Sequence, residues 1–200
     1  MPIGVFLLFL QYCFIMSYTP GPANLFAMNV GMRYGMKRFL KVYCGLFSAF
    51  FIIMVSTAIL CYGFEQFIPE ISRVLKILGT IYILWLSYII FKSKEVEENE
   101  GKEVKKDFRD CYLSGFLLNM TNVKIMIYCV SVLQMYLLTY YTTLQELFLW
   151  SIPISVFSSS STIVWALLGS RLSKSYNRHY KIYNTIMSGI LVLCVLNFFR

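Results

Sequence analysis

Six long apolar stretches dominate the sequence, and each is long enough to cross a lipid bilayer. A membrane-spanning helix needs about 20 consecutive, mostly apolar residues. The chain is 58% hydrophobic with a mean hydropathy of +0.64, and the stretches cover residues 3–30, 40–64, 67–91, 111–138, 147–169 and 183–199. Little is left for a soluble domain, so the sequence predicts an all-α integral membrane protein with six transmembrane helices.

The positively charged residues gather in three of the segments that connect these stretches. Fourteen of the 18 Lys and Arg residues lie in the first, third and fifth connections, and only Arg73, Lys76 and Arg200 lie on the other side. Because cytoplasmic loops carry the excess of Lys and Arg, the odd-numbered loops are predicted in the cytoplasm and both termini outside. The net charge of +8 is then explained by basic residues in the cytoplasmic loops, which also attract anionic lipid. It does not indicate a nucleic-acid partner.

A charged segment at 92–110 divides the chain into two halves of three stretches each. Acidic residues alternate there with lysines, which is typical of a solvated cytoplasmic linker, and the alternative is a docking site for a regulator. An odd number of spans per half makes the second half enter the membrane from the opposite side. We therefore expect two inverted three-helix repeats, at 1–91 and 111–200, joined by a cytoplasmic loop at 92–110.

The first stretch contains Pro20, Gly21 and Pro22 deep in its interior. A proline in a helix interior removes a hydrogen bond and clashes with the preceding turn, which costs about 3 kcal/mol. In lipid, the freed backbone groups are tolerated only where they face protein or a water-filled cavity. The sequence therefore predicts a helix break here, and broken helices at membrane depth mark substrate sites in transporters.

Lys124 is the only charged residue near the middle of any stretch, and Asn119, Thr121 and Asn122 make its surroundings polar. A lysine at a helix centre costs about 2.5–3.5 kcal/mol on insertion scales, so it is expected to have a partner or a task. Snorkelling to the membrane surface is the alternative, but both ends of the stretch are distant. The partner is either a carbonyl freed by the break at Pro20 or an anionic substrate group such as a carboxylate.

Helix geometry leaves the direction of this lysine open. Asn119 and Asn122 are three residues apart and share a face, whereas Lys124 lies about 200° around a regular helix from Asn122. Either the helix is distorted there, or the lysine faces a different neighbour.

A row of small polar residues follows helical spacing in the fifth stretch, at Ser151, Ser155, Ser158 and Thr162. Small side chains allow membrane helices to pack closely. The row is therefore interpreted as a packing surface, as part of a polar pathway, or as both.

No pattern in the sequence indicates a catalytic, metal or cofactor site. The six cysteines are scattered without metal-ligand spacing, and buried thiols are the expectation. His179 lies in a basic loop and is expected to be solvated. Since the stretches hold no Asp, Glu or His in their interiors, an intramembrane enzyme lacks the groups that it needs.

Several of these motifs together resemble the LysE/RhtB family of amino-acid exporters, and the resemblance covers essentially the whole chain. The residues that carry it are Pro20-Gly21-Pro22-Ala23-Asn24, Gly31, Gly35, Gly45, Gly79 with Tyr82, Gly115-Phe116 and Asn122-Val123-Lys124. The family usually has Asn-Pro-Lys at the last of these positions, so here the break in the fourth span loses its proline. An acidic residue that many members carry in the second span is also absent. The Asn-Val-Lys form resembles the subgroup that exports cysteine and O-acetylserine.

The resemblance implies secondary-active efflux of a small amino acid, either cysteine, O-acetylserine or another neutral amino acid, across the cytoplasmic membrane of a prokaryote. The implied drive is proton antiport, and without a carboxylate at the midplane it would run through Lys124, water or the substrate itself. An accessory or structural membrane subunit is the alternative. The identity of the amino acid, the direction of transport and a homo-oligomeric state stay open. The expected substrate-binding residues are Thr19, Asn24, Asn119, Asn122 and Lys124.

Overall fold

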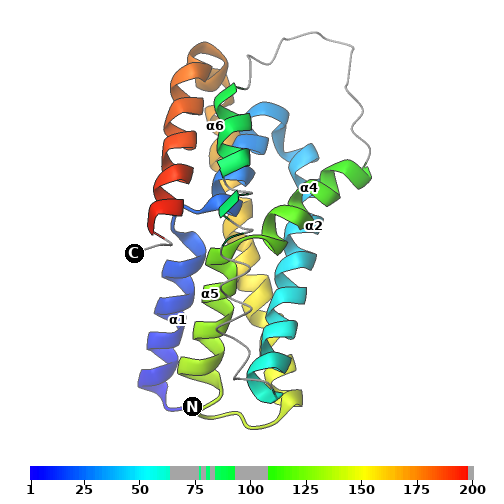
Figure 1. The fold of residues 1–200 in the computed structure, drawn as a ribbon, viewed down its shortest axis with the longest axis vertical. Helices are drawn as coiled ribbons and strands as arrows, with labels where there is room; N and C mark the ends of the chain where they lie inside the picture. The colour runs from blue at the N-terminus through cyan, green and yellow to red at the C-terminus, as the bar shows by residue number, and fades with distance from the viewer. Residues whose placement is uncertain (64–76, 78–79, 82–83, 93–107, 198–200) are drawn as a thin grey trace.

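The computed structural model describes residues 1–63, 77, 80–81, 84–92 and 108–197, and this part of the chain is helical without strands. Its named helices are α1 (Ile3–Tyr18), α2 (Pro22–Gly63), α4 (Phe108–Met120), α5 (Val123–Val132), a π-helical turn η2 (Leu133–Leu137) and α6 (Leu144–Asn197). A further helical segment covers residues 84–92. The helices form one elongated bundle in which α2 packs against both α6 and α4 (Figure 1).

The predicted break in the first stretch is confirmed. Helix α1 ends at Tyr18, Thr19 adopts an extended backbone, and α2 begins at Pro22, where proline is tolerated because a first-turn amide has no helical partner anyway. Helix α2 then bends sharply at Gly35, whose φ of 72° is readily adopted only by glycine. The division between the first two predicted stretches falls at Gly35, inside the predicted connection 31–39, but it is a sharp bend between two helical segments rather than a loop.

The fourth predicted stretch is also broken, although it has no proline. Helices α4 and α5 meet at Thr121 and Asn122 with a bend of 58° between them. Helix α4 begins at Phe108, three residues before the predicted start, so the linker is shorter than expected at this end. The rest of that linker, residues 93–107, lies outside the described residues.

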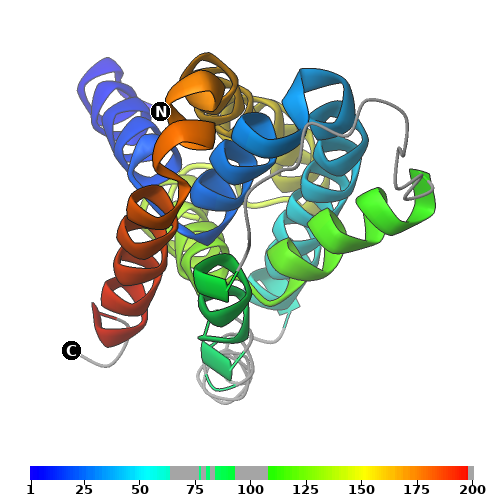
Figure 2. The ribbon, with the colours of Figure 1, turned by 90° about the horizontal axis from the view of Figure 1, so that it is seen from above.

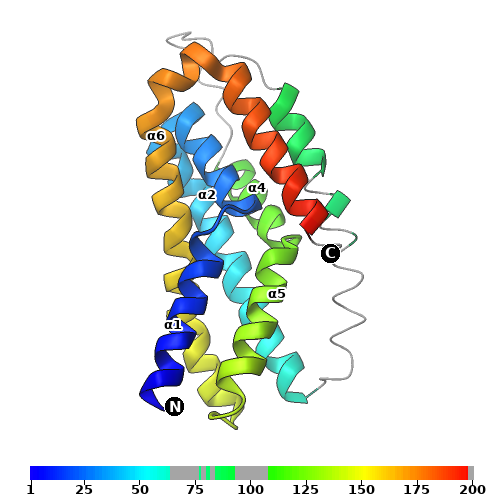
Figure 3. The ribbon, with the colours of Figure 1, turned by 90° about the vertical axis from the view of Figure 1, so that its left-hand side faces the viewer.

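Helix α6 contains the last two predicted stretches, which are joined by a bend at His179 rather than by a loop. The side chain of His179 is exposed, as expected. The helix starts with a capping box: the Thr143 amide and hydroxyl donate to a Glu146 carboxylate oxygen, and the Glu146 amide donates to the Thr143 hydroxyl oxygen. Figure 3 shows that the bends of α2 and α6 lie at the same end of the bundle, opposite the start of α1.

By length and composition, two described helices can cross a membrane, α2 and the Leu144–Tyr176 part of α6, and the bent pair of α4 with α5 and η2 adds a third. Helix α1 is apolar but shorter. The third predicted stretch, 67–91, lies mostly outside the described residues. The described part of the chain therefore has the apolar helices of a membrane protein, with two to three individually qualifying spans.

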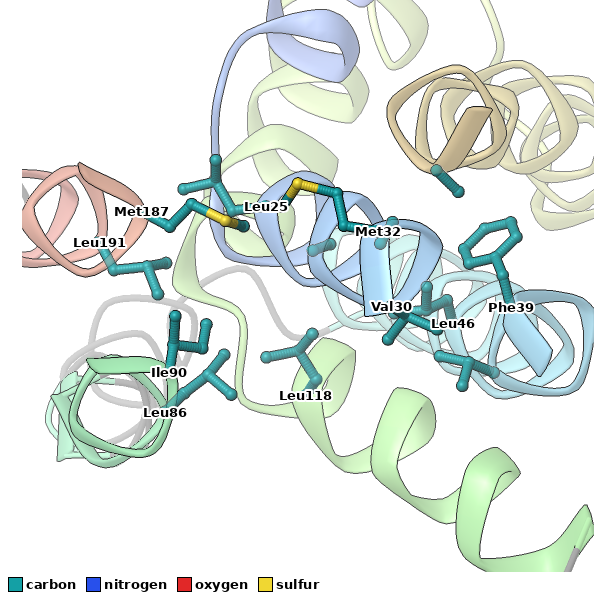
Figure 4. Packing of buried hydrophobic residues seen from close by; sticks show 14 of the residues in the cluster. Leu25, Val30, Met32, Phe39, Leu46, Leu86, Ile90, Leu118, Met187 and Leu191 are labelled. Carbon is teal, nitrogen blue, oxygen red and sulfur yellow. The ribbon is translucent and has the colours of Figure 1, made fainter. Parts of the chain in front are cut away.

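Two glycine contacts bring helices close together near the bent ends. A Cβ on Gly31 of α2 would collide with the carbonyl of Ala166 in α6, and a Cβ on Gly45 would collide with the carbonyl of Tyr112 in α4. Leu25, Leu86, Leu118 and other apolar side chains from α2, the 84–92 segment, α4 and α6 fill the space between these helices (Figure 4). The two broken helices are thus held against a common core.

Candidate functional site

The break after α1 leaves three consecutive carbonyl groups without helical partners, and side chains from α2 and α6 donate hydrogen bonds to all three. The side-chain amide nitrogen of Asn24 donates to the carbonyl oxygens of Ser17, at 2.7 Å, and Thr19, at 2.9 Å. The Trp165 indole donates to the carbonyl of Tyr18 at 3.1 Å. Because an unsatisfied buried carbonyl is costly, these contacts are what allow a broken helix inside the bundle.

The break between α4 and α5 is stabilised by Asn122. This residue has an extended backbone and its side-chain oxygen accepts a hydrogen bond from the Lys124 amide at 3.2 Å, which makes it the N-cap of α5. Asparagine is among the preferred N-cap residues because its side chain replaces a missing backbone partner. The cap therefore substitutes for the proline that is absent at Val123.

Lys124 connects the two breaks. Its ammonium nitrogen donates to the Thr19 carbonyl oxygen at 2.9 Å and to the Thr19 hydroxyl oxygen at 2.8 Å. Gly21 makes room for this contact, because a Cβ at that position would lie 2.9 Å from Cδ of Lys124. The Thr19 carbonyl thus accepts hydrogen bonds from both Asn24 and Lys124. This confirms the prediction that a carbonyl freed by the break at Pro20 is a partner of the lysine.

A pocket lies between the breaks and the facing part of α6. Its volume is about 40 Å³, which is room for a few waters at about 10–15 Å³ each. Among the described residues that line it, Lys124 is the only one with a charged side chain. The lining residues are Met16, Ser17, Gly21, Ala23, Asn24, Leu46, Phe50, Asn119, Asn122, Lys124, Ile125, Tyr128, Ser158, Ser159, Ser161 and Thr162.

Several buried polar atoms at this pocket have no hydrogen-bond partner. They are the side-chain oxygens of Ser17, Asn119 and Ser159. The amide nitrogen of Asn119 is occupied, since it donates to the Leu46 carbonyl at 2.7 Å. Unsatisfied buried polar groups are rare, and one explanation is a ligand or water that completes them. The pocket therefore combines a cation with free acceptor oxygens.

The structure brings all five predicted site residues to one place: Asn24, Asn119, Asn122 and Lys124 line the pocket, and Thr19 contacts Lys124. The conflict between the directions of Asn122 and Lys124 is resolved by the break, because Asn122 lies before α5 and is not on a regular helix with the lysine. Whether these residues contact a substrate stays a prediction.

Sequence reasoning missed residues whose role depends on tertiary contacts. No motif marks Trp165 or Tyr128, yet the Tyr128 hydroxyl lies 2.9 Å from the Ser158 hydroxyl at the pocket. Ser161 donates to the Asn24 side-chain oxygen at 3.2 Å. The polar row on α6 is buried throughout, and its members Ser158 and Thr162 also line the pocket, which agrees with both of its interpretations.

The cysteines differ in one respect from the expectation of buried thiols. Cys13, Cys61, Cys111 and Cys129 are buried and form no disulfide, but Cys44 is exposed on the bundle. The side chain of Cys194 lies outside the described residues. Among the described residues, no group of three or more potential ligands has the geometry to hold a metal ion.

Two broken apolar helices around a polar pocket that contains a cation are typical of membrane transporters, and the sequence comparison agrees. The chain matches the family described as "LysE type translocator" over residues 14–200 and belongs to it. This confirms the resemblance drawn from the motifs and places the chain among transporters rather than enzymes.

Among curated proteins, the chain is similar to those described as "Cysteine/O-acetylserine efflux protein". The relative from Salmonella typhimurium (strain LT2) is 26% identical over 191 residues, which is 96% of this chain and 95% of the relative. The relative from Escherichia coli (strain K12) is 25% identical over 192 residues, with the same shares covered. No solved structure matches the chain.

Proposed function

We propose that this protein exports a small neutral amino acid, of the cysteine or O-acetylserine kind, across the cytoplasmic membrane of a prokaryote. The observation that carries the proposal is the Lys124 ammonium held on the Thr19 carbonyl in the pocket between two helix breaks. Relatives that cover nearly the whole chain are described as efflux proteins for these two compounds. Family membership favours this function over the alternative of an accessory subunit.

The charges in the pocket suit a zwitterion. The substrate carboxylate would pair with Lys124, since a cation desolvated in a protein cavity binds an anion more strongly than it does in water. The substrate ammonium needs acceptors, and the Asn119 side-chain oxygen is buried and without a partner. The Thr19 carbonyl becomes a second acceptor when the lysine leaves it.

The contacts of Asn24 and Asn122 support roles in holding the breaks. The Asn24 amide nitrogen already donates to two carbonyls, and its oxygen accepts from Ser161. Asn122 caps α5. We infer that both residues act on the substrate mainly by positioning Thr19 and Lys124. The side-chain oxygen of each is already engaged in one of these hydrogen bonds.

The pocket, at about 40 Å³, is smaller than an amino acid, so binding requires it to widen. Release of Lys124 from Thr19 would remove the tie between the α1 end and α5. We propose that the lysine exchanges the protein carbonyl for the substrate carboxylate, and that this exchange accompanies the movement of the broken helices. Ligands shift a conformation only by binding one state better than another, and the carboxylate provides that difference.

Proton antiport is part of the proposal, and Lys124 is the group in the pocket best placed to carry it. The lining of the pocket contains no Asp or Glu among the described residues. Lysines change their protonation readily when they are desolvated. The proton would therefore pass through Lys124, water or the substrate rather than a carboxylate relay.

The six-span arrangement of two inverted repeats, 1–91 and 111–200, with both termini outside and the 92–110 segment in the cytoplasm, also stays a proposal. It is supported by the position of the bends of α2 and α6 at one end of the bundle, where the Arg33 guanidinium donates to the Tyr176 hydroxyl at 3.0 Å. Basic residues flank both bends, as the positive-inside rule requires of cytoplasmic turns. A homo-oligomer is compatible with this arrangement.

The test is efflux from proteoliposomes that contain the purified protein alone. They are loaded with cysteine, O-acetylserine, threonine, homoserine or lysine, with and without an imposed proton gradient. The proposal expects gradient-dependent export of cysteine or O-acetylserine and little export of lysine, whose second cation would face Lys124. Export of none of these by folded protein would favour the accessory-subunit alternative, and export independent of the gradient would remove proton antiport.

A further inference from the structure

A second hollow lies outside the proposed transport pocket, between the bent part of α2, the 84–92 segment and α4. We name it the lateral groove. Its volume is about 540 Å³, within the range of ligand sites in proteins. The residues that line it are Phe26, Asn29, Val30, Arg33, Tyr34, Arg38, Val42, Trp85, Leu86, Ile89, Ile90, Cys111, Leu113, Ser114 and Leu117. Figure 2 shows the three helical elements around it from above.

One end of the lateral groove is cationic. Arg33 and Arg38 lie on either side of the bend at Gly35, and the Arg38 guanidinium lies 4.5 Å from the centre of the Tyr34 ring. Among the described residues, the lining includes no Asp or Glu. This end lies with the basic residues that the proposed topology places at the cytoplasmic membrane surface. Guanidinium groups bind phosphate oxygens with two parallel hydrogen bonds, which makes a phosphate the best-matched group here.

A buried polar atom also points to a ligand that offers acceptors. The Asn29 side chain is only 8% exposed, lines the lateral groove, and its amide nitrogen has no hydrogen-bond partner. An amide nitrogen is a donor only, so the group that completes it must be an acceptor. Phosphate and ester oxygens provide such acceptors.

The walls of the lateral groove are apolar and open to the side. Trp85 and Ile89 lie one turn apart on the 84–92 segment, and Leu113 and Leu117 lie one turn apart on α4. Trp85 is 54% exposed and Leu117 is 45% exposed. In a bilayer these side chains face acyl chains, so the acyl chain of a lipid whose phosphate lies at the cationic end would lie along this apolar wall.

We propose that the lateral groove binds one anionic phospholipid, with its phosphate on Arg33 and Arg38, its ester region near Asn29, and an acyl chain along Trp85, Ile89, Leu113 and Leu117. Basic pockets between transmembrane helices on the cytoplasmic side suit such headgroups. The site touches the α2 segment and α4 that lead to the two helix breaks, so an occupied groove would stabilise both. This inference needs only the membrane location of the bundle and does not depend on the transported substrate.

The experiment is native mass spectrometry of delipidated protein with phosphatidylglycerol or phosphatidylethanolamine added at equal concentration. One phosphatidylglycerol per protein is expected to bind about tenfold more tightly than phosphatidylethanolamine, because both carry the phosphate but the ammonium of phosphatidylethanolamine is repelled by Arg33 and Arg38. Arg38→Gln should lower the affinity for phosphatidylglycerol about tenfold, while Arg38→Lys, which keeps the charge but not the paired hydrogen bonds, should recover only part of it. Lys37→Gln is the matched control, because Lys37 is exposed beside the same bend but does not line the groove.

A second pair of variants tests the apolar wall. Leu117→Asn should weaken phosphatidylglycerol binding, whereas Leu168→Asn, at a leucine of similar exposure on α6, should not. Thermal unfolding confirms that each variant is folded. Equal losses in Arg38→Gln and Lys37→Gln, or unchanged binding in both Arg38→Gln and Leu117→Asn, would overturn the proposal. Displacement of the lipid by inorganic phosphate would instead identify a soluble-anion site, and displacement by cysteine would assign the groove to the transport path.

Discussion

The Lys124 ammonium donates to both the carbonyl and the hydroxyl oxygen of Thr19, a residue 105 positions earlier in the chain. This pair links the helix break after α1 to the helix break before α5. At the first break Asn24 and Trp165 donate to the freed carbonyls, and at the second break Asn122 caps α5. The Lys124–Thr19 contact joins the two breaks, and the pocket lies between them.

The contacts of Asn24 predict a stability cost when it is removed. Asn24→Ala leaves the carbonyls of Ser17 and Thr19 with fewer donors, so the free energy of unfolding should fall by about 1–3 kcal/mol. Asn29→Ala is the matched control in the same helix, because the Asn29 amide nitrogen has no partner to lose. Thermal unfolding in the same detergent checks both. An Asn29→Ala variant that loses as much stability as Asn24→Ala would contradict the assigned role.

The cap at Asn122 predicts a difference between two substitutions. Asn122→Ala removes the acceptor for the Lys124 amide and should cost about 1 kcal/mol, with a lower transport rate because Lys124 is no longer positioned. Asn122→Ser keeps a capping oxygen and should recover most of both losses. The measurements are thermal unfolding and efflux from proteoliposomes. If serine restores neither property, capping is not what the side chain contributes.

Gly21 predicts a functional effect without a large structural one. In Gly21→Ala the new methyl group would lie 2.9 Å from Cδ of Lys124, so the ammonium has to move away from Thr19. We expect efflux to fall about tenfold, the equivalent of one charge-assisted hydrogen bond. Gly4→Ala, where no atom lies within 4 Å of the new methyl, is the control for the substitution itself. Wild-type efflux in folded Gly21→Ala would show that this geometry is not needed.

The close crossing of α2 and α6 predicts that Gly31 is a packing position. A methyl group there collides with the Ala166 carbonyl, so Gly31→Ala should lower the free energy of unfolding by about 1–3 kcal/mol through overpacking. Gly189→Ala has open space around the new methyl and should be neutral or slightly stabilising. Thermal unfolding of both variants checks this, and a harmless Gly31→Ala would mean that the two helices can separate freely.

Local sequence rules were sufficient for the first break and insufficient for the second. The effect of Pro20 and Pro22 on a helix is a property of the residues themselves, so the end of α1 at Tyr18 could be predicted. The end of α4 could not, because an asparagine interrupts a helix only where tertiary packing favours the capped form. The conflict between Asn122 and Lys124 was the one available signal, and it left two alternatives open, a distorted helix or a lysine that faces a different neighbour.

The partners of the break were beyond sequence reasoning for a related reason. Trp165 reaches the Tyr18 carbonyl because α6 crosses α2 at glycine positions, and that crossing is a three-dimensional fact. The two bends fall inside predicted connections, 31–39 and 170–182, but their form was not predicted. Dividing the sequence into apolar stretches by length predicts a loop between two spans. In the structure the chain turns at Gly35 and at His179 with almost no loop.

The central claim is that Lys124 binds the carboxylate of the transported amino acid. Its most direct test is calorimetric binding of cysteine and cysteine methyl ester, which lacks the carboxylate charge, to wild-type and Lys124→Met protein. We expect the wild type to bind cysteine about tenfold or more tightly than the ester, and Lys124→Met to lose that preference while remaining folded. A Lys124→Met protein that keeps the wild-type preference would contradict the account.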